Sequence, residues 1–143
     1  MIVVDASLAV KWLVLEPDSQ LAYAVLDAHA GEIAAPELLL SEASGAIVRR
    51  ANMDEITPAQ GAAMIDQWIG FWRDGVIDAH RLSPNLVQSA AALAMAMRHP
   101  IADCIYLALA IEQGGMLVTC DAKLKAQAGG SFAPHIKLLT EFA

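Results

Sequence analysis

Four carboxylates occupy positions from which a protein could bind a cation, and two of them follow apolar runs. Asp5 comes directly after residues 2–4, and Asp121 comes directly after residues 116–120. In parallel α/β sheets the ligand crevice lies beyond the carboxyl ends of the strands, so we expect both acids at one edge. Each acid alone is more often an ordinary loop residue or a helix N-cap, and that alternative stays open for both.

The other two carboxylates lie in predicted helices. Asp103 is the only charged residue in the run 100–111, which is apolar on every face, so we expect it to be buried and to need a compensating cation or donors. An acid in the first turn of a helix is an equally good interpretation. Glu42 lies in the second turn of the helix that begins at Pro36, next to the small residue Gly45, although a Glu on a helix is most often simply exposed.

Together the four acids predict a divalent metal site. Carboxylates at one edge repel each other unless a cation lies between them, and an all-oxygen ligand set favours Mg²⁺, with Mn²⁺ as a substitute. The histidines lack zinc-ligand spacing, so zinc and iron are disfavoured. We expect surface or capping positions for all of them: His29, His80, His99 and His135.

An alternation of strands and helices has to position these acids, and the sequence supplies one. Helix starts are marked by prolines and helix ends by glycines, and no repeat or composition shift marks a boundary. We therefore predict one domain over residues 1–143, with a mostly parallel sheet of about five strands between helix layers. The predicted strands are residues 2–4, 32–35, 77–82, 116–120 and 135–139.

The composition limits the class of protein further. The chain has 143 residues, 57% of them hydrophobic and 17% charged, which suits a single large core and excludes a disordered arm. A net charge of −7 argues against a constitutive nucleic-acid binder, but less against an enzyme whose acids surround a metal. The longest charge-free stretch, 82–97, is too short and polar to span a bilayer, and the N-terminus has no leader pattern, so we expect no membrane segment and a cytoplasmic location. Cys104 and Cys120 are expected to be buried, reduced thiols.

The order and context of the four acids resemble the PIN-domain nucleases, specifically the VapC-type toxins of prokaryotic toxin–antitoxin pairs. The stretches that carry the resemblance cover essentially the whole chain in order: 5–16, 36–42, 99–110 and 117–121. The resemblance implies a PIN-like three-layer α/β/α fold. It implies catalytic, metal-binding roles for Asp5, Glu42, Asp103 and Asp121, with supporting hydroxyls from Ser7 and Thr119. Gly45 departs from the pattern, because relatives often have Asn there.

The residues and the resemblance both predict metal-dependent hydrolysis of RNA phosphodiester bonds. A divalent ion held by carboxylates lowers the pKa of bound water and stabilises the charge that develops on the phosphate. We therefore expect an endoribonuclease that acts as the toxin of a VapBC-type system and inhibits growth by cutting RNA. Basic residues near the acids are expected to contact the RNA, although any one such residue is more often a solvated surface charge. These are Lys11, Arg49 and Lys123.

The same residues also allow other functions and imply binding partners. The main alternative is a metal-dependent RNA-binding or regulatory PIN module without cleavage activity. A HAD-type phosphatase would require Asp two positions after Asp5, where this chain has Ser7. The resemblance also implies a homodimer and a VapB-like antitoxin that covers the acidic site. The broad apolar face of the helix 59–73 leaves room for a partner, with core packing as the alternative.

Overall fold

A five-stranded parallel sheet organises the fold. The computed structural model describes residues 1–142, and in it the strands lie in the order β3-β2-β1-β4-β5 with all four pairings parallel. This confirms the predicted α/β class and the predicted sheet. The strands are β1 (Ile2–Val4), β2 (Ile33–Pro36), β3 (Asp78–His80), β4 (Met116–Thr119) and β5 (Ile136–Leu138).

The third strand is shorter than the sequence predicts. The predicted strand spans residues 77–82, but only 78–80 pair with β2, at the edge of the sheet. The chain leaves the sheet because the Ser83 hydroxyl accepts a hydrogen bond from the backbone N–H of Leu86 at 3.1 Å and so begins the next helix. The other predicted strands agree with the observed ones to within one residue at each end.

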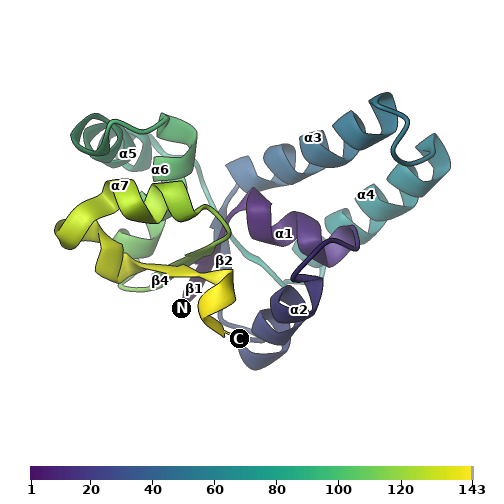
Figure 1. Ribbon diagram of the computed structural model, residues 1–143, viewed down its shortest axis with the longest axis horizontal. Helices are drawn as coiled ribbons and strands as arrows, with labels where there is room; N and C mark the ends of the chain where they lie inside the picture. The colour runs from purple at the N-terminus through teal and green to yellow at the C-terminus, as the bar shows by residue number, and fades with distance from the viewer. Residues whose placement is uncertain (143) are drawn as a thin grey trace.

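Seven α-helices connect and cover the strands in the described residues 1–142. In Figure 1, α5, α6 and α7 lie to the left of the central strands, and the first four helices lie to the right, with α3 and α4 projecting as a hairpin. This arrangement has helices on both sides of the sheet, as predicted. The helices are α1 (Ala6–Leu13), α2 (Ser19–Ala28), α3 (Leu38–Asn52), α4 (Pro58–Arg73), α5 (Pro84–Met97), α6 (Ile101–Glu112) and α7 (Ala122–Phe132). Two 3-10 turns, η1 (Ala133–His135) and η2 (Leu139–Phe142), flank β5.

Helix α6 forms the centre of the core. Every residue from Cys104 to Ala110 is buried, and the helix packs against β1, β2 and β4. Burying a leucine such as Leu107 contributes about 2 kcal/mol, so this helix is held firmly in place. Burial also raises the pKa of the Cys104 thiol to about 11, with a smaller effect from the charge of Asp103, which suits the inert, reduced thiol that the sequence predicts. The corresponding prediction for Cys120 is wrong, because this free cysteine is exposed at the end of β4.

The hairpin of α3 and α4 is attached to the body of the protein by an aromatic cluster. Trp68 is completely buried on α4 and packs edge-to-face against Phe71, which packs in the same way against Trp12 of α1. Its indole N–H donates to the backbone oxygen of Leu40 at 3.2 Å, two residues before Glu42. Core packing is therefore one role of this apolar face, and it fixes the turn of α3 that carries the acid.

No single helix within residues 1–142 is both long and apolar enough to cross a membrane. Helices α5 and α6 pass such a test only when taken together, as a pair bent by 115°.

Candidate metal centre

The four predicted acids come from four different elements that meet near the carboxyl ends of the central strands. Asp5 follows β1 and Asp121 follows β4, and these two strands are neighbours in the sheet. Asp103 lies in the first turn of α6, and Glu42 lies in the second turn of α3. The rule that parallel strands present their carboxyl ends at one edge therefore places the two strand-end acids as the sequence suggests.

Asp5 is the buried member of the set. Its residue is 8% exposed, and its Oδ1 accepts hydrogen bonds from the Ser7 hydroxyl at 2.6 Å and the Leu8 backbone N–H at 3.3 Å. Burial raises the pKa of Asp5 to about 6, because the cost of desolvation outweighs these bonds, and the charge of Asp103 raises it further. Among residues 1–142 no Lys, Arg or His forms an ion pair with Asp5. The charge of this carboxylate is met only by neutral donors.

The two predicted supporting hydroxyls connect the ends of β1 and β4. The Thr119 hydroxyl donates to Oδ2 of Asp5 and accepts from the backbone N–H of Asp121 at 3.1 Å. The Ser7 hydroxyl donates to Asp5 and accepts from the backbone N–H of Cys120 at 3.0 Å. Each hydroxyl thus orients one carboxylate oxygen and holds the loop that carries Asp121.

Glu42 is oriented by a residue that the sequence analysis missed. The phenol of Tyr106 on α6 donates a hydrogen bond to Oε1 of Glu42. Burial, followed by the hydrogen bond to Glu42, raises the pKa of Tyr106 well above its usual value, and the charges of Asp5 and Asp103 act in the same direction. The phenol is thus a neutral donor within electrostatic range of three of the four acids. Its position three residues after Asp103, on the same helical face, was the available signal.

Asp103 and Asp121 meet at a second unpredicted residue, His99. The Nε2 atom of His99 lies 2.7 Å from Oδ2 of Asp103 and 3.9 Å from Oδ2 of Asp121. The His99 side chain is only 4% exposed, so the prediction of a surface or capping histidine is wrong here. The burial predicted for Asp103 is also wrong: its side chain is 42% exposed, because the first turn of α6 emerges from the core at the edge of the sheet.

The two strand-end acids are also helix caps, as the alternative interpretation proposes, but each uses only one carboxylate oxygen for the cap. Asp5 caps α1 through Oδ1, and Oδ1 of Asp121 accepts from the Leu124 backbone N–H at 3.0 Å to cap α7. The other oxygen of Asp121 faces His99, and the other oxygen of Asp5 faces Thr119. Capping therefore fixes the orientation of each carboxylate and leaves its second oxygen directed at the site.

The predicted substrate-contacting cations differ in their surroundings. The Lys11 ammonium donates to the backbone oxygen of Pro17 at 2.7 Å and lies 3.7 Å from Glu16. Arg49 is exposed, has no ion pair within residues 1–142, and lines a groove of about 590 Å³ between α1 and α3 that also includes Ser7. Lys123 is exposed in the first turn of α7. Of the three, Arg49 is therefore the one that combines an unpaired charge with a place in the groove that leads to Ser7, which is bonded to Asp5.

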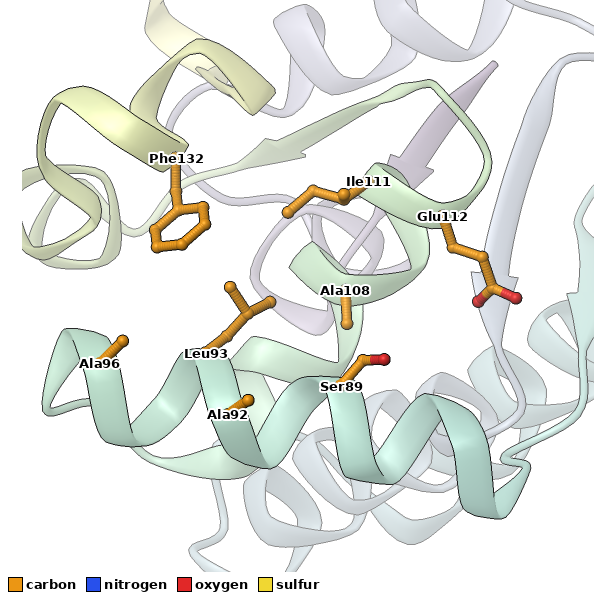
Figure 2. A pocket seen from close by; sticks show the side chains of 8 residues that line it. All are labelled: Ser89, Ala92, Leu93, Ala96, Ala108, Ile111, Glu112 and Phe132. Carbon is orange, nitrogen blue, oxygen red and sulfur yellow. The ribbon is translucent and has the colours of Figure 1, made fainter.

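An apolar groove lies apart from these acids. It measures about 690 Å³ and lies between α5, α6 and α7, as Figure 2 shows. Leu93, Ile111 and Phe132 point into it, and among residues 1–142 Glu112 is the one charged residue that lines it. Apolar walls with one carboxylate offer no catalytic group, so the acidic edge remains the candidate for chemistry.

The donor set at the acidic edge fits a divalent cation. Carboxylate oxygens of Asp103 and Asp121 and a ring nitrogen of His99 lie within 4.8 Å of one another. Asp5, Glu42 and Asp103 all lie within electrostatic range of the Tyr106 phenol, and no Lys, Arg or His in residues 1–142 forms an ion pair with Asp5. Sites that bind Mg²⁺ and Mn²⁺ typically have more carboxylate oxygens than positively charged protein groups.

An α/β domain with carboxylates at the ends of its central strands is the class of protein that this fold and site define. Comparison with protein families is more specific: the PIN domain family matches residues 2–130, and the chain therefore belongs to that family. This confirms the family to which the sequence motifs point. A search of curated proteins finds no match.

Several solved structures share the fold over nearly the whole chain. PAE2754 from Pyrobaculum aerophilum is 19% identical with a TM-score of 0.71, covering 98% of this chain and 90% of that one. The Mycobacterium tuberculosis toxin VapC20, described as cleaving the sarcin–ricin loop, is 14% identical with a TM-score of 0.74, covering 90% and 95%. A toxin–antitoxin complex from Klebsiella pneumoniae is 15% identical with a TM-score of 0.69, covering 97% and 98%. At these identities the likeness establishes the PIN-like α/β fold alone.

Proposed function

We propose that this protein is a metal-dependent endoribonuclease of the VapC type and acts as the toxin of a toxin–antitoxin pair. The observation that carries the proposal is the convergence of four carboxylates from four elements, one of them buried without a protein cation: Asp5, Glu42, Asp103 and Asp121. Acids that only stabilised the fold would not need to gather in this number at one edge, because each buried or clustered charge costs free energy. A nuclease that uses divalent ions does require them.

The metal would be Mg²⁺, with Mn²⁺ able to substitute, and the four acids would hold it. When bound, such an ion supplies the positive charge that lowers the pKa of water and stabilises the phosphate as it is attacked. The chain's own groups orient the ligands: Ser7 and Thr119 hold Asp5, and Tyr106 holds Glu42. Because these donors are in place before any ion binds, little reorganisation is needed at the site.

The RNA backbone would approach along the groove between α1 and α3. Arg49 is exposed there and is free to contact a phosphate. The Lys11 ammonium, in contrast, already donates a hydrogen bond to Pro17 and pairs with Glu16. Lys123 is exposed in the first turn of α7, two residues after Asp121, and would contact the strand there. With a net charge of −7, the protein would depend on these few cations and on bound metal to hold RNA.

The proposed partners are a VapB-like antitoxin and a second copy of the chain. The support is the recurrence of toxin–antitoxin complexes among proteins of the same fold, including the complex from Klebsiella pneumoniae. An antitoxin that places a basic side chain among the four acids would supply the charge that a metal supplies in the free toxin. The acidic edge is the natural point of inhibition for such a partner.

The test is cleavage of a labelled single-stranded RNA by the purified protein with Mg²⁺, with Mn²⁺ and with EDTA. We expect cleavage with either metal, none with EDTA, and a loss of about 100-fold or more in Asp103→Asn. Asp66→Asn, which changes an exposed acid on α4, is the matched control and should retain full activity. Metal-dependent RNA binding without cleavage by the wild type would favour the non-catalytic PIN module, and equal cleavage by Asp103→Asn would refute the site.

A further inference from the structure

His99 has surroundings unlike those of an ordinary buried histidine. It lies between α5, which ends at Arg98 in the left-handed conformation with φ of 52°, and Pro100, the N-cap of α6. Its backbone N–H donates to the oxygen of Ala94 at 3.0 Å. This tight connection directs the imidazole into the acidic edge, where the side chain is 4% exposed.

Both ring nitrogens of His99 have oxygen partners. Nδ1 contacts Oε1 of Gln127 on α7, and Nε2 faces Oδ2 of Asp103 at 2.7 Å and Oδ2 of Asp121 at 3.9 Å. Metal-binding histidines almost always donate the ring N–H that is not used for the metal to an oxygen acceptor. Gln127 is in the position of that acceptor, and Nε2 points to where two of the acids meet.

We propose that Nε2 of His99 is a direct ligand of the divalent ion, together with Asp103 and Asp121, and that Gln127 is a positioning residue for the imidazole. This inference rests on the proposed function, because it concerns the same metal. Nε2 already faces Oδ2 of Asp103 at 2.7 Å, so the two donor atoms need little movement to bind one ion.

The separations of the three donors suit a single ion. Two ligands that each lie about 2.1 Å from one metal can be at most about 4.2 Å apart. The two distances from Nε2 of His99, 2.7 Å to Asp103 and 3.9 Å to Asp121, both fall within this limit. All three donor atoms lie within 4.8 Å of one another, so small rotations of the two partly exposed carboxylates complete the site.

A nitrogen ligand changes the expected metal preference. Mg²⁺ is bound almost entirely through oxygen, whereas imidazole suits the first-row transition metals, among which Mn²⁺ also accepts carboxylates. The site should therefore bind Mn²⁺ more tightly than Mg²⁺, and the imidazole should account for much of the difference. The all-oxygen site that the sequence predicts would discriminate less between the two ions.

The experiment is pulsed EPR of Mn²⁺ bound to the intact wild-type protein, which detects ¹⁴N nuclei coordinated to the ion. We expect ¹⁴N modulation that changes to the ¹⁵N pattern when the protein is labelled with ¹⁵N-histidine, a measurement that requires no mutation. His99→Ala should lose this signal and about 10- to 100-fold in Mn²⁺ affinity. His29→Ala, at the end of α2, is the matched control and should keep both.

The same measurements separate this inference from the proposed function. Competition by Mg²⁺ should displace Mn²⁺ from His99→Ala at a lower excess than from the wild type. RNA cleavage and Mn²⁺ binding without histidine modulation would overturn the ligand role of His99 and leave the nuclease intact. A wild type that binds no Mn²⁺ would overturn both proposals. Circular dichroism of each variant checks that the loss of signal is not a loss of fold.

Discussion

Replacing Asp5 with asparagine should stabilise the metal-free protein at neutral pH and remove its function. Burial raises the pKa of Asp5 from 3.8 to about 6, so keeping this carboxylate ionised at pH 7 costs the fold about 3 kcal/mol. Asparagine removes that cost and still caps α1. The amide must, however, turn its NH₂ towards the Thr119 hydroxyl, which then loses an acceptor, and this offsets about 1 kcal/mol. The expected net gain is about 2 kcal/mol.

The sign of the pH dependence follows from the raised pKa. Between about pH 4 and pH 6 the folded protein holds a proton on Asp5 that the unfolded chain has released. The contribution of Asp5 to stability is therefore most favourable below about pH 4 and is lost as the pH rises through about 6. The difference in unfolding free energy between Asp5→Asn and the wild type should accordingly grow between pH 5 and pH 7.

Urea unfolding in EDTA, at pH 5 and pH 7, measures this difference. Asp27→Asn, which changes an exposed acid on α2, is the control and should leave the unfolding free energy within about 0.5 kcal/mol of the wild type. An Asp5→Asn protein that is less stable than the wild type at pH 7 would refute the reasoning. Asp5 would then be held for its hydrogen bonds, as a structural residue, and not for a cation.

Four further substitutions test other parts of the site and fold. Tyr106→Phe removes the donor to Glu42 and should lower Mn²⁺ affinity by about 10-fold in a calorimetric titration; an unchanged affinity would exclude a role for the phenol in orienting Glu42. Gly115→Ala places a Cβ 2.5 Å from the backbone oxygen of Met1 and should lower the unfolding free energy by about 2 kcal/mol. Gly45→Ala, where a Cβ meets nothing, should not lower it, and equal effects would contradict the packing argument. Arg49→Ala should raise KM for RNA without changing kcat and should reduce the slope of log affinity against log salt by about 1; an unchanged salt slope would show that Arg49 contacts no phosphate.

The parts of the site that the sequence could predict are those governed by local rules. Asp5 and Asp121 each follow an apolar strand, and the geometry of parallel sheets brings such positions to one edge. The apolar character of α6 indicates a central buried helix, and the structure has one. For these elements, strand and helix patterns contain enough information to place the acids roughly.

The remaining parts depend on contacts between distant segments. His99 is oriented by Gln127, 28 residues away, and Glu42 is bonded by Tyr106, 64 residues away. No local period encodes such pairs. The exposure of Asp103 depends on how the first turn of α6 emerges at the end of α5, and the average hydrophobicity of a helix does not report on its first turn. The same applies to the short β3, which ends before the predicted boundary, ahead of the N-cap of α5.

A crystal of the protein soaked with Mn²⁺ and measured for anomalous scattering tests the central claim most directly, because it locates the metal without reference to activity. We predict an anomalous peak about 2.2 Å from carboxylate oxygens of Asp103 and Asp121, on the side that faces Asp5. The peak should be absent in a crystal of Asp103→Asn treated in the same way. A wild-type crystal without a peak at this edge, at an Mn²⁺ concentration that supports full RNA cleavage in solution, would contradict the account.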